Sequence, residues 1–315
     1  MKQERSTTAM IEAALVALIV TVVVLTIGYI PLIGYLTAFM PAIFASVWIR
    51  RGRHYGILSV FVSSILTFIL GFPAESFAVL AYGGVVGGFL GEGFRNQLKA
   101  SQTILLGAVG SAFSMILVFS FAELLTGIGL MQIFTQAIDQ SREMIKAYNM
   151  DPALVADMNT QFDIMATQMQ NMLPFILIMS AAITSSINHW AVRKGLNRIR
   201  FTLPEAGLFR DFALPRNVFI GSMIMMLLAW FTGIIGLGNS DVLFLNILLV
   251  VTLVFSIQGA AVAIFFMYHY KFPRSAVVAF TVGGILFYSM LQFPLFVLGM
   301  LETVINLRER MKVKA

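Results

Sequence analysis

Four carboxylates offer the most distinctive chemistry in this sequence, because they lie in or beside strongly apolar stretches. They are Glu75 in "GFPAES", Glu123 in "FSFAELL", Asp241 in "LGNSDV" and Glu302 in the last apolar run. An ionisable side chain at membrane depth is costly and is often functional. Glu75 and Asp241 could equally be solvated loop or helix-cap residues, since turn-forming residues precede Asp241. Glu123 is the hardest of the four to explain in that way.

A small ligand pocket would make use of such carboxylates. Tyr82 and Asn171 would lie at a depth similar to that of Glu75 and Glu123, near the outer face. We therefore predict a site for a small solute formed by Glu75, Tyr82, Glu123 and Asn171. The tyrosine could instead belong to the belt of aromatic residues found at membrane interfaces.

The stretch "AYGGVVGGFLGEGFRNQ", residues 81–97, is rich in glycine. A Walker-type phosphate loop needs a Lys–Ser/Thr pair after its last glycine, which "EGFRN" does not provide, and a dinucleotide fingerprint needs a preceding soluble strand. What remains is the spacing of the glycines. Small residues four positions apart let two helix backbones approach closely in lipid. The predicted packing seam comprises Gly83, Gly84, Gly87, Gly88 and Gly91.

Two further features belong with this seam. Glu92 continues one glycine row and is predicted to pair with Arg95 on the same helix. The motif "AMIEAALVAL" places Ala9, Ala13 and Ala17 four residues apart on one helix face. This alanine row could serve ordinary packing within the bundle or form a docking surface for another membrane subunit.

Enzymatic and metal chemistry have no visible basis in the residues. The chain has no cysteine, which excludes disulfides, thiolate metal sites and cysteine nucleophiles. His54, His189 and His269 lie far apart, and none has a neighbouring ligand at metal spacing. We therefore expect no catalytic residue, no metal and no cofactor. Any energy from ATP would have to come from another subunit.

The composition places these residues in a membrane. Hydrophobic residues make up 59% of the chain and charged residues only 11%, well below the roughly 25% typical of soluble proteins. The net charge of +6 is spread over short clusters between apolar runs, which argues against nucleic-acid binding. Runs of spanning length lie near 9–27, 31–49, 55–70, 77–94, 103–125, 173–192, 218–237 and 242–268, and a longer run covers 275–305.

The positive charges predict how the chain is threaded. Lysine and arginine gather in every second connection, so these connections and the N-terminus are expected on the cytoplasmic side of a bacterial inner membrane. The run 275–305 is too long for one simple span. A turn at Leu291–Phe296, around Pro294, would make it a short hairpin and keep the basic tail inside, whereas a single span would leave the tail outside. We favour the hairpin.

These elements predict an all-α polytopic bundle of about eight to ten spans. Residues 1–192 form a six-span bundle, 193–216 a basic cytoplasmic loop, and 217–315 the C-terminal membrane helices with a basic tail. Within the first part, residues 131–172 are polar and are predicted to form two external amphipathic helices, the second capped by Asp151 and starting at Pro152. They could act as a ligand lid or as a passive cap on lipid headgroups.

Several of these motifs carry a resemblance to a known family. The alanine row, "YIPLIGYLTAFMP", "RRGRHYG" and the glycine-rich fourth span resemble the substrate-binding S-component of energy-coupling-factor transporters over the first 190 or so residues. The whole chain, including "LGMLETVINLRER", is similar to the YybS-like family of uncharacterised bacterial membrane proteins. The longer external insertion and the additional C-terminal helices depart from a simple S-component.

The resemblance implies roles for some residues. Ala9, Ala13 and Ala17 would contact a membrane coupling subunit, which would itself work with cytoplasmic ATPases. Glu75, Tyr82 and Glu123 become ligand candidates by depth alone. The leading expectation is therefore a membrane component that binds and moves a small solute together with partner subunits. The alternative is a non-transporting scaffold or sensor that recruits a cytoplasmic partner through 193–216.

Overall fold

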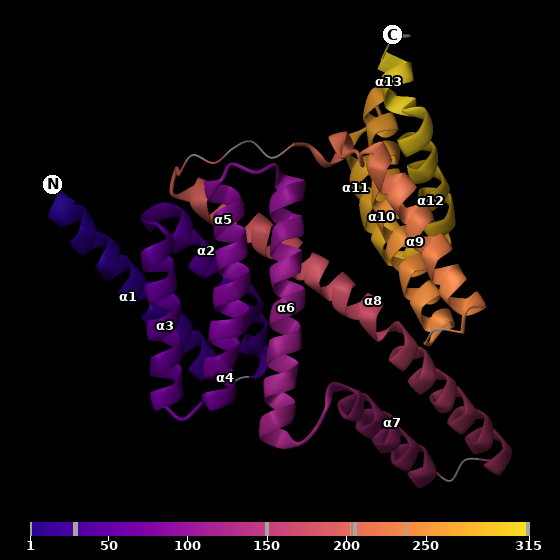
Figure 1. Cartoon of the computed structure of the whole chain (residues 1–315), viewed down its shortest axis with the longest axis horizontal. Coiled ribbons are helices and arrows are strands. Elements are labelled where there is room, and N and C mark those ends of the chain that lie inside the picture. The colour runs from indigo at the N-terminus through magenta and orange to yellow at the C-terminus, as the bar shows by residue number, and fades with distance from the viewer. Residues whose placement is uncertain are drawn as a thin grey trace. The chain divides into compact units, whose positions relative to one another are not determined.

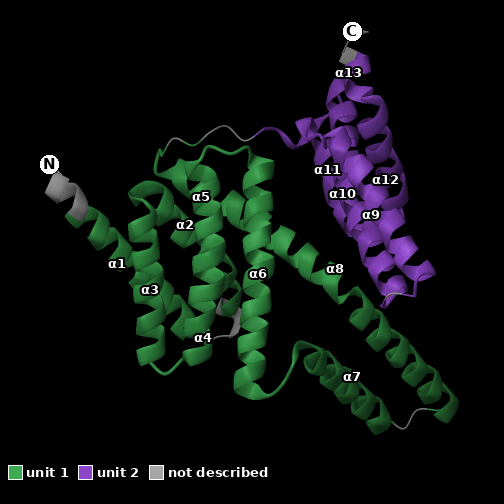
Figure 2. Cartoon of the chain, viewed as in Figure 1, with its two compact units in different colours: residues 1–206 green, residues 207–315 purple. Residues whose placement is uncertain are grey.

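The computed structural model describes residues 2–27, 31–148, 151–201, 203, 207–236 and 238–312. These residues form helices and connecting turns, with no strand among them. The chain divides into two compact units, Met1–Ala206 and Gly207–Ala315, coloured separately in Figure 2. Seven of the described helices are long and apolar enough to cross a membrane, and two shorter apolar helices accompany them. The predicted all-α polytopic fold is thereby confirmed.

Unit 1 is a helical bundle with a long extension (Figure 1). Its elements are α1 (Lys2–Ile27), the 3-10 helix η1 (Pro31–Phe39), α2 (Met40–Arg51), α3 (Arg53–Ile69), α4 (Pro73–Ala78), the π-helix η2 (Val79–Val86), α5 (Gly87–Arg95), α6 (Ala100–Thr126), α7 (Leu130–Ala147) and α8 (Pro152–Arg198). The helices α4, η2 and α5 run on as one apolar span, Pro73–Arg95. The second apolar run is instead divided between η1 and α2.

The predicted external insertion is built differently from the expectation. Asp151 accepts a hydrogen bond from the backbone N–H of Ala153 at 2.8 Å and caps the helix that starts at Pro152. That helix does not end near Met172. It continues as α8 to Arg198, because Pro174 is accommodated inside it. The second amphipathic helix is therefore the N-terminal part of a helix of 47 residues, and α7 packs against it through an Arg142–Asp163 ion pair at 2.6 Å.

Unit 2 contains η3 (Phe209–Asp211), α9 (Arg216–Ile234), α10 (Ser240–His269), α11 (Arg274–Leu286), α12 (Tyr288–Ile305) and α13 (Leu307–Lys312). The closest approach is between α10 and α12. A Cβ built on Gly259 would overlap the carbonyl oxygen of Leu295, and one on Gly299 would overlap that of Phe255. Small residues at both crossing positions let the two backbones touch, as is common for helices in lipid.

The last apolar run forms a hairpin, although its turn lies earlier than predicted. Ser256 of α10 bonds to Gln292 near the start of α12, while Arg308 beyond its end bonds to Arg210, whose guanidinium lies 4.7 Å from the Tyr268 ring. Helix α12 therefore runs parallel to α10, and α11 must descend before α12 rises (Figure 1).

The helix break in this hairpin is at Phe287, between α11 and α12, and not at Leu291–Phe296. Pro294 lies inside α12, because a membrane helix can tolerate proline when neighbouring helices pack around it. The hairpin itself was predicted correctly, and the residue assigned to its turn was wrong.

Candidate functional site

The break between η1 and α2 is the most distinctive polar feature of unit 1. Phe39, the last residue of η1 and the N-cap of α2, has φ −95° and ψ 0°, and Pro41 occupies the first turn of α2. Proline is favoured there because it brings no N–H that would need an intrahelical partner. Arg50 and Arg51 mark the far end of α2, so the break lies about 15 Å into the bundle from that basic end.

Asn188 of α8 bridges this break. Its side-chain oxygen accepts from the backbone N–H of Ala42 at 2.9 Å, and its side-chain nitrogen donates to the carbonyl oxygens of Ala38 and Thr184, both at 2.9 Å. The residue is fully buried. The amide thus satisfies backbone groups on both sides of the break, where an unpaired group would be costly.

Tyr82 joins the same junction from the neighbouring span. Its hydroxyl donates to the carbonyl oxygen of Ala38 at 3.1 Å. Tyr82 lies in η2, a π-helical turn, and such turns inside α-helices occur frequently at functional sites. The carbonyl of the adjacent Ala81 accepts from Ser114 of α6 at 2.7 Å. We refer to Ala38, Ala42, Tyr82 and Asn188 as the polar junction.

The remaining predicted ligand residues lie elsewhere in unit 1. Glu75 is half-buried in the first turn of α4, and Glu123 is exposed near the end of α6. Asn171 precedes Asn188 by 17 residues on α8, which places it about 25 Å away along the helix axis. The polar junction therefore contains Tyr82 alone of the four predicted ligand residues.

Sequence reasoning missed Asn188, the central residue of the junction. It lies in "SSINHW", where several polar side chains follow one another within an apolar span. That cluster was the available signal. The neighbouring His189 is buried and stacks on Phe94 of α5, with ring centroids 4.9 Å apart, which gives it a packing role beside the junction.

The glycine row of η2 and α5 lies directly against α2 and α3. A Cβ added to Gly87 would lie 2.9 Å from the carbonyl oxygen of Pro41, and one on Gly91 would lie 2.7 Å from Trp48 Cγ. The same test brings the other members of the row into contact: Gly83 with Phe44, Gly84 with Val60 and Gly88 with Trp48. These close contacts leave no room for larger side chains, so the glycines set the spacing around the polar junction.

The alanine row of α1 is enclosed within unit 1. Ala9, Ala13 and Ala17 are 3%, 1% and 0% exposed. Next to them Thr21 of α1 lies 3.4 Å from the Ser63 hydroxyl of α3. The side chains of this row pack within unit 1, and their contact with a second subunit stays a prediction.

Ion pairs close one end of the bundle. Glu12 of α1 binds Arg50 and Arg51, the latter at 2.6 Å. Glu92 pairs with Arg53 across the turn between α2 and α3, its Oε2 accepting from the guanidinium at 2.8 Å. The direct ion pair is with Arg53 and not with the predicted Arg95, because the turn at Gly52 brings Arg53 beside the carboxylate. Arg95 interacts with Glu92 through its charge only.

In unit 2 the buried carboxylate Glu302 has a structural partner. It binds Arg308 at 2.7 Å, and both side chains are only 7% exposed. Arg308 also donates to the carbonyl oxygens of Arg210 and Phe212 at 2.7 and 2.9 Å. The basic stretch 193–216 is therefore fixed to unit 2 at its C-terminal end. Asp241 lies in the first turn of α10, whose N-cap is Asn239 and which has no side-chain cap hydrogen bond.

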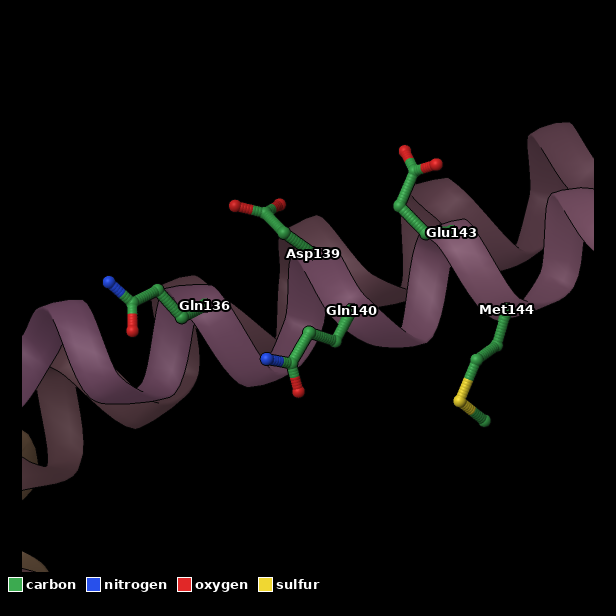
Figure 3. A pocket seen from close by; sticks show the side chains of 5 residues that line it. All are labelled: Gln136, Asp139, Gln140, Glu143 and Met144. Atoms are coloured by element: carbon green, nitrogen blue, oxygen red, sulfur yellow. The ribbon is translucent and has the colours of Figure 1, made fainter.

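Two surface hollows of the described residues are shallow. One lies on α7 and is lined by Gln136, Asp139, Gln140, Glu143 and Met144. Figure 3 shows that all five side chains come from this one helix and point outward on different sides. The other lies on the apolar face of α9 around Leu227 and Phe231. Neither has the opposing walls that enclose a small ligand.

The fold and the buried polar groups define an all-α integral membrane protein. The chain belongs to the family described as predicted membrane protein (DUF2232), whose model matches residues 18–303. It is similar to the uncharacterized protein YybS of Bacillus subtilis (strain 168), with 22% identity over 319 residues, covering 99% of this chain and all of that protein. No solved structure matches it. Membership of the YybS-like family is confirmed, and the S-component resemblance stays a prediction.

Proposed function

We propose that this protein binds a small solute in unit 1 and moves it across the membrane together with partner subunits. The observation that carries the proposal is the polar junction. An interrupted helix inside an apolar bundle, with its backbone groups held by side chains from other spans, is the usual construction of a solute site in transporters.

The junction also supplies the chemistry that such a site needs. Ala38 O receives hydrogen bonds from both Tyr82 and Asn188, and these bonds can be exchanged for bonds to a polar solute. The tightly packed glycines next to it favour small movements of whole helices over rearrangement of side chains. A solute with both hydrogen-bond donors and acceptors fits this arrangement.

Energy for transport would come from other proteins. We propose a membrane coupling subunit and cytoplasmic ATPases as partners, with the N-terminus on the cytoplasmic side of a bacterial inner membrane and no catalytic role for this chain. The buried alanine row leaves the outward face of α1, including Met10, Leu15 and Ile19, as the surface of that helix available to a membrane partner.

The proposal is tested by purifying the full chain from its native membranes without denaturation. Small molecules released from it are identified by mass spectrometry, and co-purified proteins are sequenced. We expect a bound polar metabolite that is lost in Tyr82→Phe but retained in Tyr148→Phe, a change at an exposed residue following α7. A wild-type protein that carries neither a small molecule nor an ATPase assembly contradicts the proposal.

The separate prediction for the outer residues is tested by Glu123→Gln. Because Glu123 is exposed, this variant should fold normally. Loss of the bound molecule would assign the solute site, or its entrance, to the outer end of α6. Unchanged binding would remove Glu123 from the ligand candidates and leave the polar junction as the site.

A further inference from the structure

The hairpin of unit 2 turns within the apolar region. Ser256 lies near the middle of α10 and donates to the carbonyl oxygen of Gln292 at 3.3 Å. Gln292 follows the start of α12 by about one helical turn. The turn at Phe287 therefore lies beside the apolar N-terminal half of α10, between the levels of Asp241 and Ser256.

The backbone at this turn has unmet hydrogen-bonding capacity. The N–H of Phe287 donates to Gly283 at 2.8 Å, and the N–H of Leu291 donates to the carbonyl oxygen of Phe287 at 3.2 Å. Within the described ranges, the carbonyl oxygens of Gly284, Ile285 and Leu286 accept no bond across the turn. Hydrocarbon supplies no donor, so irregular backbone at this depth persists only where protein or water covers it.

The same turn carries unused donors and a large apolar surface. The Tyr288 and Ser289 hydroxyls make no hydrogen bond to any part of the chain that the structure describes, and Ser289 is exposed. Around them the large apolar side chains are unusually uncovered: Ile285 73%, Leu286 72%, Met290 76% and Phe293 73% exposed. We call residues 284–293 the hairpin tip.

We propose that the hairpin tip is a contact between two copies of this chain. The tip holds open acceptors and open donors within a few residues of each other, so it is complementary to itself. Around a two-fold axis, the Ser289 and Tyr288 hydroxyls of one copy meet the Gly284–Leu286 carbonyls of the other, and each copy supplies what the other lacks. The apolar side chains pack around these bonds.

Self-complementarity selects a second copy over other occupants. Lipid covers the apolar side chains but leaves the carbonyls without donors. A helix of a different protein would need donors of its own for these carbonyls. If it brought donors alone, the Ser289 hydroxyl would be left without an acceptor. The proposal concerns assembly and stands independently of the proposed transport function.

Cross-linking in native membranes tests the contact, because the chain has no cysteine of its own. Met290→Cys and Phe293→Cys place a thiol at the tip, and Leu227→Cys places one on the apolar face of α9, where the side chain is 63% exposed. Oxidation should convert most of the tip variants to a covalent dimer and leave the α9 variant monomeric. Absence of dimer at both tip positions, or an adduct of a different protein, would overturn the proposal.

A second measurement examines the hydrogen bonds without a thiol. Fluorescently labelled protein is diluted into liposomes, and energy transfer between copies is followed as the lipid-to-protein ratio rises. Ser289→Ala should weaken the dimer about tenfold, the effect of removing two symmetry-related hydrogen bonds in lipid. Thr281→Ala is the matched control, because Thr281 bonds to Val277 within its own helix. Equal dimerisation of both variants and wild type would overturn the role of Ser289.

Discussion

The two units each interrupt an apolar helix, and they treat the interruption in opposite ways. In unit 1 the groups freed between η1 and α2 are held by Asn188 and Tyr82, which come from other spans of the same unit. In unit 2 the carbonyls freed at Phe287 meet no such side chain among the described residues. An interruption that a unit completes by itself can serve as an internal site, whereas an incomplete one is suited to contact with another molecule.

Unit 2 is instead secured at the base of its hairpin. Arg308 ties the end of α12 to the stretch before α9, and Gln258 of α10 accepts from the N–H of Leu214 at 2.7 Å while donating to Thr303 at 2.8 Å. These contacts are buried. The hairpin is thus anchored at one end and open at its tip, which is the reverse of the closed arrangement around Asn188.

The largest expected effect comes from removing the anchor of unit 2. Arg308→Ala leaves Glu302 as a buried carboxylate without its partner and frees two backbone carbonyls. Breaking a buried pair in this way costs about 3–5 kcal/mol. We expect that loss in the free energy of unfolding, measured by denaturant titration in detergent micelles. The exposed Arg310→Ala is the control and should change it little. Equal stability of the two variants would show that the base is not the anchor.

Asn188→Ala is the corresponding change in unit 1. It leaves the N–H of Ala42 without its partner and removes one of the two donors to Ala38. Each buried group left unsatisfied costs about 1–3 kcal/mol, so we expect a loss of about 2–4 kcal/mol in the same titration. Asn197→Ala, at an exposed position on the same helix, is the matched control. A loss no larger than that of the control would mean that the junction is not held by this amide.

The comparison also shows what the sequence can predict. Apolar runs of spanning length and the glycine spacing at residues 83–91 predict spans and close packing, because both depend on local pattern. The hairpin was predicted from the position of the basic tail. The break at Phe287 could not be placed, because Pro294 is the stronger local signal and only packing against α10 keeps α12 helical through it.

The polar junction could not be predicted from local sequence pattern, for a different reason. Tyr82 was selected by its depth, but its partner Ala38 is 44 residues away, and Asn188 reaches the same carbonyl across 150 residues. Such contacts exist only once the spans are assembled. Arg95 was predicted as the partner of Glu92 because a neighbour on the same helix is visible in the sequence. The approach of Arg53 across a turn is not.

The smallest effect, and the sharpest contrast between the two interruptions, concerns glycine. At Gly87, beside the closed junction, an added Cβ would lie 2.9 Å from the backbone carbonyl of Pro41, which cannot move aside alone. Gly87→Ala should therefore cost about 1–3 kcal/mol of stability through overpacking. At Gly283, one turn before the break in unit 2, nothing lies within 4 Å of an added Cβ.

Gly283→Ala should accordingly have the opposite sign. Alanine favours the helical conformation that Gly283 already adopts, so the variant should gain up to about 1 kcal/mol in isolated, detergent-solubilised protein. Both variants are compared with wild type by thermal unfolding in the same micelles. A destabilised Gly283→Ala would indicate that the hairpin tip is already closely packed in the isolated chain. The contrast between a sealed and an open interruption would then be lost.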